Sequence, residues 1–454
     1  MKHDHGTERG QVLIMIAFGI IGLIGMVALA TDGGRAYSDR RHAQNAADTA
    51  VLAGARAYTR AEDWKAASLA IALENGYDDT EDDLDQTSDA VNVEVYQCNE
   101  ADDADTIVDC GEYDIDVDPD HADEYLLAKI TSIVPTTFAN VIGIQDITNT
   151  VFAIAHVKPS ERTPFMDGNA VIGMSPDGCS AVKYSGSAET RVESDESSMG
   201  GIFVNSTCTN DAFKNQSSGG TLYAPHLCVV GDTSVDPYDT GDAIEIPSDE
   251  YNIGSDECKD KGYPPENYNF PNTAICDGAP AAAVVDVPLA DDYMTPGEWF
   301  GTFPPANVVA LSPGLYCVHG DFTLGAADSL AGVNVSIWVF DGDVEWHGGA
   351  EVNLQAYPQG YGEVSGLLIY LPLSDPIDYT HVVHLNGNSN SYLKGTVLAP
   401  SAECTVNGAG DIPRIDGQFA CYTVELSGSS DLYLRYNDTE NWFALTHPMI
   451  ELTE

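Results

Sequence analysis

The chain has 454 residues, of which 71 are Asp or Glu and only 19 are Lys or Arg, so its formal net charge is −52. This balance excludes a general nucleic-acid binder, because recognition of phosphates requires clustered basic side chains. The length allows two or three domains. We interpret the acidic charge as a property of solvated surfaces; the alternative is an acidic surface protein that binds divalent cations such as calcium.

The first predicted element is a membrane-spanning helix. Residues 12–30 form an uncharged apolar run, which as a helix would be about 28 Å long, close to the hydrocarbon thickness of a bilayer. Ala28-Leu29-Ala30 matches a signal-peptidase site, so release of a soluble protein starting at Thr31 is the alternative. The run is longer than a usual signal core of about 7 to 15 residues, which favours a retained anchor.

Four blocks of residues follow one another at the N-terminus: Arg9-Gly10-Gln11, the apolar run, Asp32-Gly33-Gly34-Arg35, and an alanine-rich segment at 44–55. Their order resembles the N-terminal region of the TadG-like proteins of bacterial tight-adherence (Flp) pilus-assembly systems. The resemblance implies a single-pass protein of the bacterial cell membrane that is not an enzyme, with pilus-assembly or other envelope proteins as partners. The residues that match are Arg9, Gly10, Gln11, Asp32, Gly34, Arg35, Gln44, Ala46, Ala47, Asp48, Ala50, Ala53, Gly54 and Ala55.

Ten cysteines follow the apolar run and none forms a Cys-x-x-Cys pair, which indicates disulfides in an oxidising compartment. They place the C-terminal body outside the cytoplasm. The positive-inside rule alone would favour the opposite orientation, because the basic residues after the run outnumber those before it by one. Sequence leaves the connectivity open. Local spacing favours the pairs Cys98–Cys110, Cys179–Cys208, Cys258–Cys276 and Cys404–Cys421, leaving Cys228 with Cys317.

We assign residues 1–34 to the tail and anchor and 35–76 to a helical stalk, which has no proline and many helix formers. Small residues recur in the stalk at alternating spacings of four and three and line one seam. This seam could receive a partner subunit, but packing against the chain's own next domain is the favoured interpretation. The small residues are Ala43, Ala47, Ala50, Gly54 and Ala57.

Residues 77–157 are predicted to form a small α/β domain that resembles the pilin-like layout of related tight-adherence proteins. Alternating valines at 91–95, the pair Ile115 and Val117, and residues 125–134 and 151–157 are strand candidates. A short helix should follow Pro135 and end at Gly143. Residues 158–167 contain two prolines and mixed charge, which indicates a linker.

The third predicted domain, residues 168–446, is all β, so the fold class is a multidomain α+β chain. Turns of similar chemistry recur about every twenty residues, as stacked coils produce. Residues 366–400 resemble the right-handed parallel β-helix repeats of bacterial surface proteins, and the resemblance implies that fold; a β-sandwich is the alternative. Residues 232–306 would be a loop-rich excursion pinned by one disulfide, and 447–454 a C-terminal tail. The strand candidates are 201–204, 333–340, 366–371, 381–385, 392–399, 420–426 and 432–436.

Candidate catalytic and metal-binding groups are few. Asp341, Asp343, Glu345 and His347 could supply acid–base catalysis, but Asp-Gly is also a common turn, and the region has few basic residues to bind an acidic polysaccharide. His381 and His384 should point to opposite faces of a strand. No P-loop, Gly-x-Ser-x-Gly, His-Glu-x-x-His or dinucleotide motif occurs.

A calcium loop is suggested by carboxylates at alternate positions after residue 113. The pattern fails the EF-hand rule, because Pro119 stands at the sixth position and Tyr125 at the twelfth. No cofactor is therefore predicted, with calcium as the one candidate ion. The four carboxylates are Asp114, Asp116, Asp118 and Asp120.

The leading hypothesis is therefore a membrane-anchored structural or adhesive envelope protein, with a possible surface or glycan target. A carbohydrate-active β-helix enzyme and an acidic divalent-ion-binding protein are the alternatives.

Overall fold

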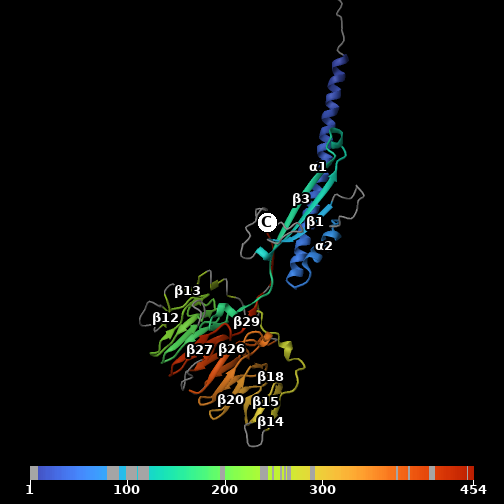
Figure 1. Cartoon of the computed structure of the whole chain (residues 1–454). Helices are drawn as coiled ribbons and strands as arrows, with labels where there is room; N and C mark the ends of the chain where they lie inside the picture. Colours follow the sequence, from blue (N-terminus) through green and yellow to red (C-terminus); the bar gives the residue numbers. More distant parts are fainter. Residues whose placement is uncertain are drawn as a thin grey trace, which may run out of the picture. The chain divides into compact units, whose positions relative to one another are not determined.

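The computed structural model divides the chain into two compact units (Figure 1): unit 1 is Met1–Glu161 with His447–Glu454, and unit 2 is Arg162–Thr446. The structure describes residues 9–78, 91–98, 110, 122–194, 200–235, 244–247, 250–255, 258–259, 262, 267–286, 292–374, 377–386, 389–407, 415–446 and 448–453.

Unit 1 begins with one continuous helix, α1 (Arg9–Tyr58), which contains both the apolar run and the first part of the predicted stalk. The stalk is not a single helix, because the chain turns after Tyr58 and α2 (Trp64–Glu74) follows. The Asp63 side chain starts α2 by accepting a hydrogen bond from the Ala66 amide at 3.0 Å. The break therefore coincides with an N-cap within an otherwise helical sequence.

A four-stranded antiparallel sheet packs against α1. Its order is β1 (Val91–Gln97), β2 (Tyr125–Pro135), β3 (Asp146–Lys158) and β30 (Met449–Thr453). A short 3₁₀ helix, η2 (Ala122–Glu124), precedes β2, and η3 (Ala139–Ile142) lies in the β2–β3 connection and ends at Gly143 with φ 93°. The predicted strand residues Ile115 and Val117 lie outside the described residues.

The predicted C-terminal tail is wrong, because β30 is the fourth strand of this sheet. Its backbone pairs with the free edge of β3, from Ile154 opposite Thr453 to Lys158 opposite Met449. The segment Met-Ile-Glu-Leu-Thr has the β-prone composition of an edge strand, but its partner is some three hundred residues away in sequence. Only the fold brings the two together.

Unit 2 is a large, mostly parallel sheet of 24 strands, with a small β4–β29 pair. Among its described strands, the antiparallel pairs are β14–β15 and β4–β29, whereas a β-sandwich consists mainly of antiparallel pairs. The 3₁₀ helices among its described residues are η4 (Phe165–Gly168), η6 (Thr273–Cys276) and η7 (Gly362–Val364). The strands are β4 (Arg162–Pro164), β5 (Val171–Gly173), β6 (Val182–Tyr184), β7 (Thr190–Ser194), β8 (Ile202–Val204), β9 (Phe213–Asn215), β10 (Leu222–Tyr223), β11 (Leu227–Val229), β12 (Ile244–Glu245), β13 (Tyr251–Ile253), β14 (Ala283–Val285), β15 (Asp292–Thr295), β16 (Gly297–Phe300), β17 (Val308–Leu311), β18 (Gly314–His319), β19 (Phe322–Leu324), β20 (Ser329–Val333), β21 (Val335–Val339), β22 (Val344–Trp346), β23 (Glu351–Gln355), β24 (Leu367–Tyr370), β25 (His381–Leu385), β26 (Tyr392–Asn407), β27 (Ile415–Ser427), β28 (Leu432–Tyr436) and β29 (Phe443–Leu445).

The chain enters unit 2 at the middle of a row of parallel strands. Strand β5 pairs with β8 on one side and with the late strand β27 on the other. From β5 the row continues through β8 to β11 and β13, and from β27 through β26, β24, β21 and β18 to β16. In Figure 1 the green strands from the early part of unit 2 accordingly lie beside the red β26 and β27.

One line of buried side chains crosses this row. The described residues 258–259, 262 and 267–276, which we call the strap, include side chains of the same core cluster. The described strap residues Tyr268 and Phe270 pack on the line, and the Tyr370 hydroxyl lies 3.5 Å from the Pro271 carbonyl oxygen. The line consists, in register order, of Cys228, Phe203, Ile172, Ala420, Leu398, Tyr370, Trp338 and Cys317.

The strap is bonded at both ends, which corrects two of the predicted disulfides. Cys258 bonds Cys228 and Cys276 bonds Cys317, so the excursion at 232–306 is pinned by two bridges rather than one. A Cys228–Cys317 bond is impossible, because seven strand steps of about 4.8 Å put these residues roughly 34 Å apart. The other pairs have the predicted partners: Cys98–Cys110, Cys179–Cys208 and Cys404–Cys421.

Candidate functional site

The small-residue seam of α1 packs on the chain's own sheet. Ala43, Ala47 and Ala50 are fully buried and belong to one core cluster with Leu126, Ala128 and Ile130 of β2. Small side chains let the helix approach the sheet closely, which explains why alanine recurs there. The favoured interpretation of the seam, internal packing, is what the structure shows.

Gly54 faces α2 at close range. A Cβ atom at this position would lie 2.1 Å from the Ser68 hydroxyl oxygen and 3.2 Å from the Trp64 carbonyl oxygen. Even an alanine would therefore require the Ser68 hydroxyl to turn away and the Trp64 carbonyl to shift slightly, so packing favours glycine here.

Asp32, just after the apolar run, holds the turn between β2 and β3. Its carboxylate accepts hydrogen bonds from the amides of Thr137 (3.0 Å), Phe138 (2.8 Å) and Ala139 (2.7 Å). The bond from Ala139 contributes most to lowering the pKa of Asp32, burial opposes it, and the other two bonds and Arg35 add to the lowering. Arg35 also donates to the Thr137 hydroxyl at 3.1 Å.

A second aspartate on the same helix face also binds this hairpin. Asp39 accepts hydrogen bonds from Ser132 at 3.1 Å and Asn149 at 2.8 Å, and Asn149 also donates to the Ala36 carbonyl oxygen. Sequence reasoning missed Asp39. The signal was available, because a residue seven positions after Asp32 lies on the same face of a helix.

The remaining motif residues have simpler roles. Gln44 donates to Asp48 at 2.8 Å and to the Phe152 carbonyl oxygen at 2.9 Å, which adds another link from α1 to β3. Ala46 and Ala55 are fully buried, Ala53 is half-buried and Gly34 is exposed. Arg9, Gly10 and Gln11 form the start of α1.

Asp32→Asn should loosen the β2–β3 turn. One amide oxygen cannot replace a carboxylate that accepts three hydrogen bonds, so we expect faster hydrogen exchange at the amides of residues 137–139. Because the pKa of Asp32 is lowered on folding, its contribution to stability is present at neutral pH and is lost as the pH falls through the lowered value. Asp48→Asn, which removes a charge on the same helix, is the control and should leave these amides unchanged.

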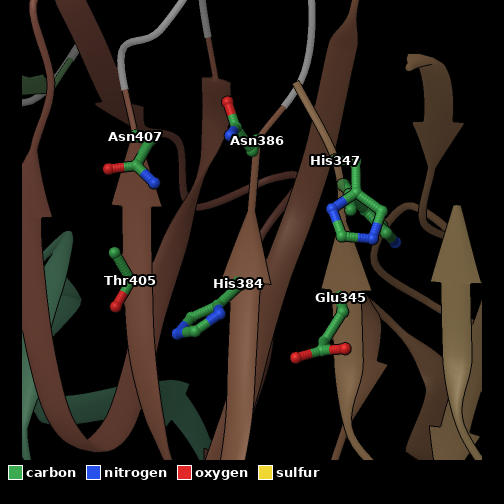
Figure 2. A pocket seen from close by; sticks show the side chains of 7 residues that line it. Glu345, His347, His384, Asn386, Thr405 and Asn407 are labelled. Atoms are coloured by element: carbon green, nitrogen blue, oxygen red, sulfur yellow. The ribbon is translucent and has the colours of Figure 1, made fainter. Parts of the chain in front are cut away.

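In unit 2, a pocket of about 170 Å³ lies over three parallel strands, β22, β25 and β26. Figure 2 shows the side chains that line it. Glu345 lies opposite His384, and His384 opposite Thr405, in the strand register. His347, Asn386 and Asn407 lie further along. The pocket therefore gathers two of the sequence candidates, Glu345 and His347, with His384.

The pocket does not gather the other candidates. The Asp343 carboxylate accepts a hydrogen bond from the Val382 amide at 3.0 Å and lies 3.2 Å from His381 Nδ1, so it joins neighbouring strands. Asp341 lies 3.3 Å from His319. Glu345 is thus the single carboxylate among the described lining residues, whereas glycoside hydrolysis usually uses two.

The described residues contain no group of three or more His, Cys, Asp or Glu side chains that could hold a metal ion. The calcium candidates Asp114, Asp116, Asp118 and Asp120 lie outside the described residues.

Unit 1 contains an apolar N-terminal helix, of the kind found in both membrane anchors and signal sequences, and a disulfide. In the part of the chain that the structure describes, one helix, Val12–Tyr58, is long and apolar enough to cross a membrane, with 6% of its most apolar window buried. Together with the disulfides, this helix indicates an extracytoplasmic body.

Residues 10–57 match the family described as putative Flp pilus-assembly TadE/G-like. The resemblance seen in the N-terminal blocks is thereby confirmed for this region. No curated protein and no solved structure matches the chain. The matched segment is α1 itself, whose buried and hydrogen-bonded motif residues hold the sheet of unit 1.

Proposed function

We propose that this protein is a membrane-anchored, extracytoplasmic structural or adhesive component of a tight-adherence pilus-assembly system. The observation that carries the proposal is the family match over α1. Membership of that family implies association with pilus-assembly machinery, and the protein would act through surfaces rather than through a catalytic centre.

A retained anchor is supported by the exposure of the apolar run. Leu13, Phe18 and Leu29 each expose more than two thirds of their surface, and nearly the whole run is uncovered by protein. An apolar surface of this extent is unfavourable in water and favourable in lipid. Asp32 and the buried alanines after it belong to unit 1's fold, so the helix continues from the anchor into the domain without a break.

We further infer that unit 2 is the right-handed parallel β-helix expected from the sequence, displayed outside the cell. Support comes from the strand register, in which consecutive parallel pairs such as Cys317 with Trp338, and Phe322 with Val344, advance by about twenty residues. Each coil would bury its inward side chains on the next coil. The domain plan is then an anchor, a small α/β domain that includes the stalk helices, and the β-helix. The linker expected at 158–167 is wrong, because Lys158 ends β3, and β4 and η4 already belong to unit 2; the connection is only residues 159–161.

Cell fractionation tests the anchor. We expect the full-length protein in the membrane fraction, resistant to extraction with sodium carbonate, and with an intact mass that includes residues 12–30. A variant with Ala28 and Ala30 both changed to Leu, which removes the signal-peptidase motif, should behave identically. A soluble mature protein starting at Thr31, restored to the membrane by that variant, would contradict the proposal.

A further inference from the structure

The β2–β3 connection, residues 136–145, carries exposed apolar side chains and is called the hairpin tip here. Phe138, Val141 and Ile144 are 38%, 76% and 48% exposed. The tip is structured, since η3 lies within it and Asp32 binds three of its amides. These side chains are therefore held outward by the fold.

The tip is also free of charge. From Ile130 to Gln145 the sequence contains no Asp, Glu, Lys or Arg, in a chain that has 71 acidic residues. Carboxylates would keep this surface hydrated, and their absence leaves an uncharged, apolar tip. A surface that binds a polar partner would not need to be both apolar and uncharged.

The position of the tip along α1 is fixed by hydrogen bonds. Ser132 and Asn149 bind Asp39, and residues 137–139 bind Asp32, so the hairpin advances along the helix towards its N-terminus. Figure 1 shows β3 following α1 in this way. Asp32 is two residues beyond the apolar run, or about 3 Å along the axis. The tip therefore lies at the level where the run ends.

We propose that the hairpin tip is a second membrane contact, in which Phe138, Val141 and Ile144 enter the interfacial layer of the bilayer that α1 spans. The proposal rests on the retained anchor proposed above. Continuity with the apolar run identifies lipid as the occupant. Tyr37 and the arginines at 35, 40 and 41 are exposed on the adjoining turns of α1, and such side chains are favoured at the membrane surface.

A second contact has a mechanical consequence for unit 1. A single helix can tilt and rotate in a bilayer, and its orientation is set by neighbouring interfacial anchors. With the tip in the interface, tilting α1 away from the side that carries the tip would lift its apolar side chains out of lipid. The sheet of unit 1 would thus be held at one angle to the membrane.

Tryptophan reporters test this contact in the full-length, oxidised protein reconstituted into phosphatidylcholine–phosphatidylglycerol vesicles. Val141→Trp and, as a second reporter, Ile144→Trp should add fluorescence that is blue-shifted and quenched by brominated lipids. Val333→Trp, at an exposed strand position in unit 2, is the matched control and should add fluorescence that these lipids do not quench. The fluorescence of the native tryptophans is measured on the unmodified protein and subtracted.

The outcomes separate the two proposals. If the protein floats with the vesicles but both tip reporters emit as water-exposed tryptophan without quenching, the tip contact is refuted and the anchor stands. A surface reserved for a protein partner would give this result. If the protein does not float with the vesicles, the anchor is refuted and the tip contact with it.

Discussion

Ala47→Leu should destabilise unit 1 by roughly 1–3 kcal/mol, because overpacking a close-packed interior forces side chains and backbone to shift. Ala47 is 0% exposed and lies on the face of α1 that packs on the sheet, in the cluster that includes Ala128 and Ala153. The leucine would push the helix away from β2 and β3. The effect is large because α1 contacts the sheet through side chains that are already the smallest available.

Hydrogen exchange of the β2 and β3 amides is the measurement, since it reports on unit 1 separately from unit 2. Ala70→Leu is the control: it makes the same change at an exposed position of α2 and should leave exchange nearly unaltered. If the β2 and β3 amides exchanged equally slowly in the two variants, the seam would not be a tightly packed interface. The interpretation that it binds a partner subunit would then be favoured.

Cys258→Ser should leave the thiol of Cys228 free, and mass spectrometry of the non-reduced digest should find it there. The pairing favoured by sequence spacing would instead free Cys276. Removing both Cys228 and Cys258 should cost about 3–4 kcal/mol, the loop-entropy expectation for a bridge with a sequence separation of 30.

The double variant Cys179→Ser, Cys208→Ser is a matched control, because its bridge has a separation of 29. Both double variants should lose similar overall stability. Only loss of the Cys228–Cys258 bridge should release one end of the strap and expose residues 267–276 to proteolysis. Equal cleavage of the strap in both variants would contradict its attachment at Cys258.

The N-terminal region could be predicted well because its signals are local. The apolar run, the alanine spacing in the seam and the short helix ended by Gly143 each depend on neighbouring residues, and the structure contains all three. The break before α2 was missed because the residues around Asp63 are compatible with one longer helix until the cap is seen.

The remainder depends on contacts between distant parts of the chain. The two strap disulfides could not be found from spacing, because the chain leaves one end of the strand row at β13 and resumes at the other end with β16. Cys258 and Cys276, although consecutive cysteines in the sequence, thus bond to opposite ends of the row. The pocket side chains Glu345 and His384 likewise meet only through strand register.

The return of β30 to unit 1 makes unit 2 an insertion between two neighbouring strands of another domain. As the chain is synthesised from its N-terminus, the edge of β3 remains open until residues 449–453 follow, and an open strand edge can pair with other chains. Completion of unit 1 therefore waits for synthesis of the whole of unit 2. A pull on unit 2 would reach unit 1 through two adjacent strands, so the load would be shared between β3 and β30.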